Sequence, residues 1–462
     1  MTLNKYIGNK QFYKATLSVA LPIMVQNFIT NFVSMLDNLM VGALGTEEMS
    51  GVSIINQLLF VFNLAVFGAL SGAGIFTAQF YGKKDNDGIR YTLRYKFIIG
   101  FIILILGCTV FLLFGTELIG LYIHDVDKSC DIALTVDFAK KYLSVILFGL
   151  LPFTVSQIYS STLRETGETL APMLSGIAAV ITNCTFNYLL IFGKFGFPKM
   201  GVEGAAIATN LSRYVECIII IIYSVKKKNR FSYFKGACKS LYIPKPILKG
   251  VVVKGTPLLI NEFLWATGQM LLSIAYSLHG LSVVAGYSIY STVINLANIA
   301  FITLGASIGI IVGRQLGSGQ YEEAVDTDRK LIVFSVLMSI AIGLFVFSVG
   351  GKIPELYKTS NASKMYASYL IRAGALLLPI DAFANASYFT LRSGGKTFIT
   401  FLFDSVFALA VSVPLAFSLY YFAHLSIYYI FPIVVGAGII KDIFGFILIK
   451  KKVWVNNIVT VG

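Results

Sequence analysis

Apolar residues along the chain occur in long uninterrupted blocks, separated by short polar breaks with glycine-rich turn chemistry. Each block is long enough, at about 20 residues or more, to cross a membrane as a helix. The blocks fall near 16–43, 50–80, 95–116, 138–163, 170–192 and 204–225, and then near 250–279, 284–313, 330–350, 365–391, 398–421 and 426–450. This pattern predicts an all-α polytopic membrane protein with twelve transmembrane helices.

The second set of six blocks repeats the first. A shift of 235 residues brings glycine, proline and arginine positions into register: Pro22 with Pro257, Gly45 with Gly280, Gly51 with Gly286, Gly74 with Gly309, Gly82 with Gly317, and Arg94 with Arg329. Glycine and proline set backbone geometry, so matches at one fixed shift indicate a structural repeat. Six spans return the chain to its starting side, which makes the repeats parallel, related by a pseudo-two-fold axis along the membrane normal. We therefore expect an N-lobe at 1–225, a basic linker at 226–248 and a C-lobe at 249–462.

Composition and charge agree with a membrane protein. The 462 residues are 56% hydrophobic and only 13% charged, against about 25% charged in soluble proteins. The net charge of +14 gathers in alternate loops and in the linker, which predicts that these loops and both termini face the cytoplasm. We expect Lys228 and Arg392 to face the cytoplasm and Asp127 and Lys358 to face outward. The membrane is expected to be a plasma membrane, such as a bacterial inner membrane. The charge thus indicates an anionic lipid partner rather than nucleic acid.

Two acids lie inside spans of the second half, each a few residues after a proline. Glu262 follows Lys254 by eight residues and Asp381 precedes Arg392 by eleven, so both lie roughly 12 to 16 Å from the same membrane face. Intramembrane acids are expensive and mark functional sites. Like charges at one depth cannot both stay ionised without a counter-ion. We predict that Glu262 and Asp381 form one coupled titrating site that binds sodium or a proton.

The first half offers a second oxygen-rich cluster. Asp37 lies in the first span, Asn183 and Asn187 lie four residues apart on one face of the fifth, and Thr209 lies in the sixth. Sodium prefers such oxygen ligands, so it could bind at Asp37 and Asn183 or at Glu262 and Asp381. Amides and hydroxyls of this kind equally often only join helices. No cofactor beyond the coupling ion is expected.

A cavity between two six-helix lobes would hold the substrate. Its candidate lining residues are Asn27, Trp265, Gln269 and Tyr388. An acidic cavity with aromatic side chains favours amphipathic organic cations. Other charged residues have simpler expectations: Arg213 and Glu216 as a local ion pair, and Asp404 at the membrane interface.

At these residues the chain resembles the multidrug and toxic-compound extrusion (MATE) family over essentially its whole length. The stretches that carry the resemblance are LDNLMVGALG, AGIFTAQFYGKKD, GTPLLINEFLW, LRSGGKT and, most distinctive, GVEGAAIAT. The resemblance implies twelve helices in two lobes and drug export driven by inward sodium or proton movement. It also implies an N-lobe cluster of Asp37, Asn183 and Thr209, with Glu262 and Asp381 as C-lobe acids. Asn187 departs from the pattern, because some members have aspartate there, and this places more weight on the C-lobe.

Three other functional classes stay open. A related lipid-linked oligosaccharide flippase would have more spans and a more basic cavity than the mainly acidic intramembrane charge seen here. A membrane-embedded enzyme would need a nucleophile–base set or a metal cluster. The sequence contains no HExxH motif, and its GxSxG match, GASIG at 305–309, lies inside an apolar block rather than at a strand-to-helix turn. A channel would usually build its pore from rings of like subunits. We therefore expect a transporter for drug-like small molecules, not an enzyme, acting as a monomer.

Overall fold

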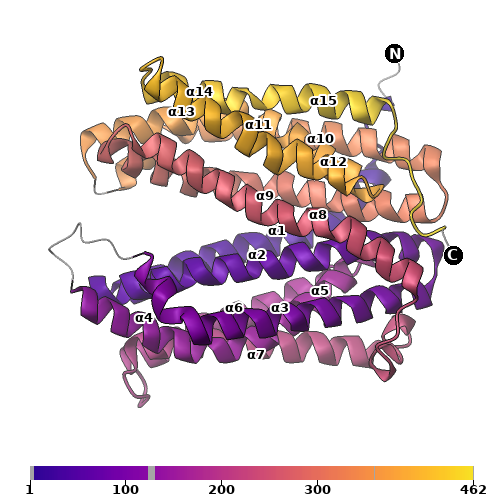
Figure 1. Cartoon of the computed structure of the whole chain (residues 1–462), viewed down its shortest axis with the longest axis horizontal. Helices are drawn as coiled ribbons and strands as arrows, with labels where there is room; N and C mark the ends of the chain where they lie inside the picture. Colours follow the sequence, from indigo (N-terminus) through magenta and orange to yellow (C-terminus); the bar gives the residue numbers. More distant parts are fainter. Residues whose placement is uncertain (1–4, 123–130, 358, 461–462) are drawn as a thin grey trace. The chain divides into compact units, whose positions relative to one another are not determined.

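The computed structural model describes residues 5–122, 131–357 and 359–460, which form long helices joined by short turns (Figure 1). Twelve helical segments are long and apolar enough to cross a membrane, and this part of the chain contains no strand. The predicted all-α fold with twelve spans is therefore confirmed. Asp127 and Lys358, expected on the outside, lie beyond the described residues.

Nine spans are single helices. They are α1 (Lys10–Gly42), α2 (Thr46–Lys83), α3 (Asn86–Gly120), α6 (Leu170–Phe192), α7 (Gly201–Lys226), α8 (Lys245–Ser277), α9 (Leu281–Gly317), α10 (Tyr321–Val349) and α11 (Asn361–Ser393). Pro22, Pro257 and Pro379 lie inside α1, α8 and α11. Each proline lacks the N–H of a helical hydrogen bond, so it marks a point where its helix can bend.

Three spans are broken. The fourth joins α4 (Ile132–Ile146) to α5 (Leu150–Glu165) through a 3₁₀ turn, Leu147–Gly149. The eleventh runs from α12 (Thr397–Phe401) through two π-helical segments, Leu402–Val406 and Ala408–Ser412, to α13 (Val413–Tyr421). The twelfth joins α14 (Ile427–Gly436) to α15 (Gly438–Lys450). Wide π turns inside helices often mark functional sites.

The chain forms two compact units that do not follow chain order. One contains residues 25–77 and 86–249, and the other contains 1–24, 78–85 and 250–462. Helices α1 and α2 therefore each contribute to both units. In α1 the division falls two residues after Pro22. The lobe boundaries expected from the sequence remain a prediction.

The repeated glycines make equivalent close contacts in both halves. A Cβ on Gly51 would lie 2.9 Å from the carbonyl oxygen of Thr135, and a Cβ on Gly286 would lie 3.1 Å from that of Ser363. Because lipid is as apolar as leucine, close packing through small residues holds transmembrane helices together. The matching contacts explain why glycine recurs at this position of the repeat.

The basic linker packs back onto the first half of the chain. It contains two 3₁₀ turns, Ser232–Phe234 and Ala237–Lys239, before α8 begins at Lys245. Buried Arg94 of α3 donates to the carbonyl oxygens of Ala237 (3.0 Å), Tyr242 (2.8 Å) and Gly236 (3.3 Å). One arginine thus satisfies three linker carbonyls and fixes the linker at the end of this helix.

Candidate functional site

The predicted N-lobe cluster is assembled in the unit that contains residues 25–77 and 86–249. The Asn187 side-chain nitrogen donates to Oδ1 of Asp37 (2.5 Å) and to Oδ1 of Asn183 (3.1 Å). The Asn183 nitrogen donates to Oγ1 of Thr209 (3.3 Å). Helices α1, α6 and α7 therefore each bring polar side chains to one point.

The amide of Asn183 can be placed either way round, because its oxygen and nitrogen have nearly the same shape. With the nitrogen toward Asp37, it lies 2.7 and 3.1 Å from the two carboxyl oxygens. An ionised carboxylate only accepts hydrogen bonds, so this placement suits an ionised Asp37.

A buried oxygen in the cluster lacks a donor. Asn187 is 1% exposed, and its Oδ1 has no hydrogen-bond partner among the described residues. Buried polar atoms are normally satisfied. An unpartnered acceptor beside the carboxylate of Asp37 and the oxygens of Asn183 and Thr209 fits a hard cation or a bound proton donor.

In the other unit, the π-helical segment carries Asp404 into a polar network. Asn261 donates to Oδ2 of Asp404 (3.2 Å), and the hydroxyl of Ser405 donates to Oδ1 of Asn261 (2.6 Å). The ammonium of Lys441, on α15, lies 3.8 Å from Oδ1 of Asp404. Asp404 thus joins α8, the eleventh span and α15, and its expected place at the membrane interface stays a prediction.

Glu262 and Asp381 lie near different charges. Glu262 interacts electrostatically with Arg392 and Asp404, whereas Asp381 interacts electrostatically with Lys441. Among the described residues, no hydrogen bond joins the two acids. Their shared site remains a prediction, and it has to accommodate two protein cations that already neutralise part of the acidic charge.

The four candidate cavity residues differ in exposure. Gln269 is exposed, as is Trp265, and Asn27 is half-buried. Tyr388 is buried, with the guanidinium carbon of Arg392 6.0 Å from its ring centre. Trp265 and Gln269 are therefore not covered by other side chains, whereas Tyr388 packs beside Arg392.

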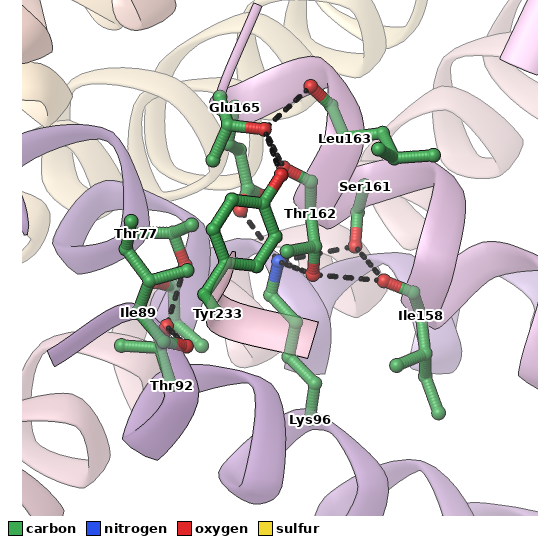
Figure 2. A network of polar contacts seen from close by, with 12 residues as sticks. Thr77, Ile89, Thr92, Lys96, Ile158, Ser161, Thr162, Leu163, Glu165 and Tyr233 are labelled. Atoms are coloured by element: carbon green, nitrogen blue, oxygen red, sulfur yellow. Dashed lines mark hydrogen bonds and ion pairs between the residues drawn. The ribbon is translucent and has the colours of Figure 1, made fainter. Parts of the chain in front are cut away.

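Sequence reasoning missed a buried ion pair between α3 and α5. Figure 2 shows the ammonium of Lys96 pointing at Glu165, with the hydroxyls of Ser161 and Thr162 beside it. Its nitrogen lies 2.5 Å from Oε2 of Glu165, 3.1 Å from Ser161 and 3.2 Å from Thr162. The sequence places Lys96 near a basic loop, and only the fold reveals that its side chain is fully buried.

Other partly buried cations alter the sequence interpretation. Arg164, assigned to a cytoplasmic loop, donates to Oε1 of Gln26 on α1 (2.8 Å). Glu216 interacts electrostatically with Arg164 as well as with Arg213. Among the described residues, Arg213 and Glu216 do not approach within 4.0 Å, so the expected ion pair is not formed. Intramembrane charge in the first half is therefore mixed rather than mainly acidic.

Comparison with known proteins supports a transporter. One curated relative is a probable multidrug resistance protein NorM of Thermotoga maritima, which is 27% identical over 87% of this chain and 85% of the relative. Another is a probable multidrug resistance protein YoeA of Bacillus subtilis, which is 25% identical over 88% of this chain and 86% of the relative. Both similarities extend over nearly the full length, and neither relative is described as an enzyme.

Solved structures share the fold. An outward-facing multidrug resistance MATE family transporter of the MOP superfamily superimposes with a TM-score of 0.83 at 18% identity, covering 97% of this chain and 98% of its own. A MOP superfamily transporter from Pyrococcus furiosus, described as having a binding pocket of reverse polarity, gives 0.82 at 17%, covering 97% of both chains. At such identities the similarity shows the fold alone.

The MatE family model matches residues 22–189 and 257–418. The two matched segments begin at Pro22 and Pro257, the first residue pair of the internal repeat. Together they cover more than half of the sequence. The chain therefore belongs to the MatE family and is a multidrug transporter of the MATE type.

Proposed function

We propose that this transporter exports amphipathic, drug-like organic compounds, cationic ones foremost, by exchanging them for sodium ions or protons in alternating access. The observation that carries the proposal is the cluster of Asp37, Asn183, Asn187 and Thr209. It contains one carboxyl group and an unpartnered buried oxygen. Such a site can hold either a proton or a cation.

The C-lobe acids are proposed to take part in coupling as well. Glu262 and Asp381 would titrate together. The positive charges of Arg392 and Lys441 would neutralise part of their negative charge, and the remainder would attract a cation from solution. We further propose that the basic linker and both termini face the cytoplasm of a bacterial inner membrane, where anionic lipid neutralises them.

The test is dye efflux from loaded cells that contain wild type or Asp37→Asn. Asparagine keeps the size of the side chain and removes the charge. We expect transport to fall at least ~10-fold with normal membrane insertion, because the ion can no longer change the charge of the site. Asp137→Asn is the matched control, since Asp137 is half exposed and pairs with Lys141 on the surface of α4.

Full efflux by Asp37→Asn at normal expression would assign Asp37 a structural role. The main observation that supports the proposal would then be lost. Movement of lipid-linked sugars without dye efflux would favour the flippase alternative.

A further inference from the structure

Three charged residues in the unit of residues 25–77 and 86–249 lie close together without pairing. They are Arg164 on α5 and Arg213 and Glu216 on α7, and we call them the Arg–Glu–Arg group. Both guanidinium groups interact electrostatically with the carboxyl group of Glu216. Among the described residues, none of the three forms an ion pair within 4.0 Å. The group therefore holds opposite charges near one another that do not neutralise one another in direct contact.

Several donor atoms around the group are buried without an acceptor from the described chain. Arg164 donates to Oε1 of Gln26 on α1 (2.8 Å), but its Nε has no hydrogen-bond partner. Nη1 of Arg213 is likewise buried and unpartnered, with its guanidinium carbon 5.2 Å from the ring centre of Phe153. The buried hydroxyl of Ser160, one turn before Arg164 on the same face of α5, is unpartnered too. Buried donors normally have acceptors, so these three can hold a further one.

Packed neighbours hold the two arginines in place. A Cβ on Gly149, in the 3₁₀ turn between α4 and α5, would lie 3.1 Å from Cδ of Arg213. The break in the fourth span therefore makes room for the stem of this arginine. Gln26, which accepts from Arg164, packs closely on α6, because a Cβ on Gly176 would lie 2.9 Å from its side-chain nitrogen. The donors are thus fixed before any ligand binds, which lowers the cost of binding.

The charges of this region do not balance. Arginine keeps its proton in proteins, so Arg164 and Arg213 bring two positive charges against the one carboxyl group of Glu216. Glu165 also interacts electrostatically with Arg164, but it is paired with Lys96 at 2.5 Å. These five residues therefore carry at least one positive charge in excess. A buried charge is costly unless it is paired, and one monovalent anion would restore the balance.

We propose that Arg164 and Arg213 bind a small monovalent inorganic anion of the size of chloride between α5 and α7, with the hydroxyl of Ser160 as a further donor. Guanidinium groups form strong, charge-assisted hydrogen bonds with anions. Such an ion would join donors from both helices and, through Gln26, stabilise the position of α1. Glu216 would weaken its binding by repulsion. The inference does not depend on the direction or the coupling of transport.

The experiment measures the thermal unfolding midpoint of the purified full chain while sodium gluconate is replaced by sodium chloride or sodium bromide. The sodium concentration and the ionic strength stay constant, so any effect of sodium is the same throughout. Gluconate is too large for the site. We expect chloride and bromide to raise the midpoint of wild type by about 2 °C or more, with saturation. Anomalous scattering from crystals grown in bromide should give a peak beside Arg164 and Arg213.

Three variants and one control separate the site from a general salt effect. Arg164→Gln and Arg213→Gln each remove a guanidinium group and should lose most of the halide response. Glu216→Gln removes the repulsion, so its response should saturate at about ten-fold lower chloride. Arg372→Gln is the matched control, because Arg372 is exposed and also contacts an aromatic ring, that of Phe347 at 5.8 Å. This control should respond like wild type.

The proposal is overturned if the midpoint of wild type is the same in chloride and gluconate, or if both arginine variants keep the full response. A bromide peak found elsewhere, with none at the Arg–Glu–Arg group, also overturns it. If the arginine variants do not fold, the bromide peak and the Glu216→Gln titration decide, since unchanged saturation there contradicts the site. No transport is measured, so this failure is separate from a failure of coupling at Asp37, which dye efflux tests.

Discussion

The Lys96–Glu165 pair predicts unequal costs for removing its two charges. Glu165→Gln leaves a fully buried ammonium without a counter-charge, with only neutral acceptors: the amide oxygen at position 165 and the hydroxyls of Ser161 and Thr162 (Figure 2). Breaking a buried pair in this way costs about 3 to 5 kcal/mol of stability. Lys96→Met leaves the carboxylate instead, which is 14% exposed and can gain water, so the loss should be about 1 to 3 kcal/mol. Replacing both, as Lys96→Met with Glu165→Leu, removes the charges together and should cost less than Glu165→Gln alone.

The assay is the thermal unfolding midpoint of purified protein in one detergent, with the fraction of monodisperse protein as a second measure. A further variant, Gly74→Ala, tests the geometry, because its Cβ would overlap Oε1 of Glu165. Gly120→Ala is its control, since no atom lies within 4 Å of the added methyl group. The midpoints should fall in the order wild type, Lys96→Met, Glu165→Gln. Equal losses for the two single variants, or a double variant that loses their sum, would show that the two charges act independently and refute the reasoning.

Two further predictions concern orientation and the C-lobe. Cysteines at Lys228 and Arg392 should resist an impermeant maleimide added to intact cells, whereas one at Glu355 should be labelled; outside labelling at position 228 would reverse the assigned orientation. Glu262→Gln and Asp381→Asn should each stop coupled transport in folded protein, with the double variant little worse than either, as expected for residues that act as a unit. Losses that multiply in the double variant would instead show that Glu262 with Arg392 and Asp381 with Lys441 are separate sites.

The apolar pattern was sufficient to predict the twelve spans, because span length is set by membrane thickness and not by tertiary contacts. The N-lobe cluster could also be predicted from the sequence. The four-residue spacing of Asn183 and Asn187 places both on one helix face, and an acid within a span more often has a functional role than a structural one. Gly82 and Gly317 were found as a repeat, but their close contacts with the backbone of Arg314 and Gln79 depend on how α2 and α9 cross. No local pattern contains that information.

Charged residues near span ends were the hardest to place from sequence. Lys96 and Arg164 lie a few residues from polar loops, where long side chains can equally reach water or turn inward. The nearby Lys396 predicts Asp404 at the interface, but the sequence does not predict its contacts with Asn261 and Lys441, which depend on the π-helical segment. A single extra residue in a helical turn changes which face a side chain occupies, and composition does not reveal it.

The central claim, that export is driven by an ion bound at Asp37, is tested most directly by drug-driven counterflow in proteoliposomes. Purified protein is reconstituted with either a sodium or a proton gradient imposed alone, and release of the ion is recorded when a cationic dye is added. The account predicts that dye addition moves at least one of the two ions in wild type and in Asp137→Asn, and neither ion in Asp37→Asn. Dye transport by wild type that moves neither ion, or ion movement that persists in Asp37→Asn, would contradict it.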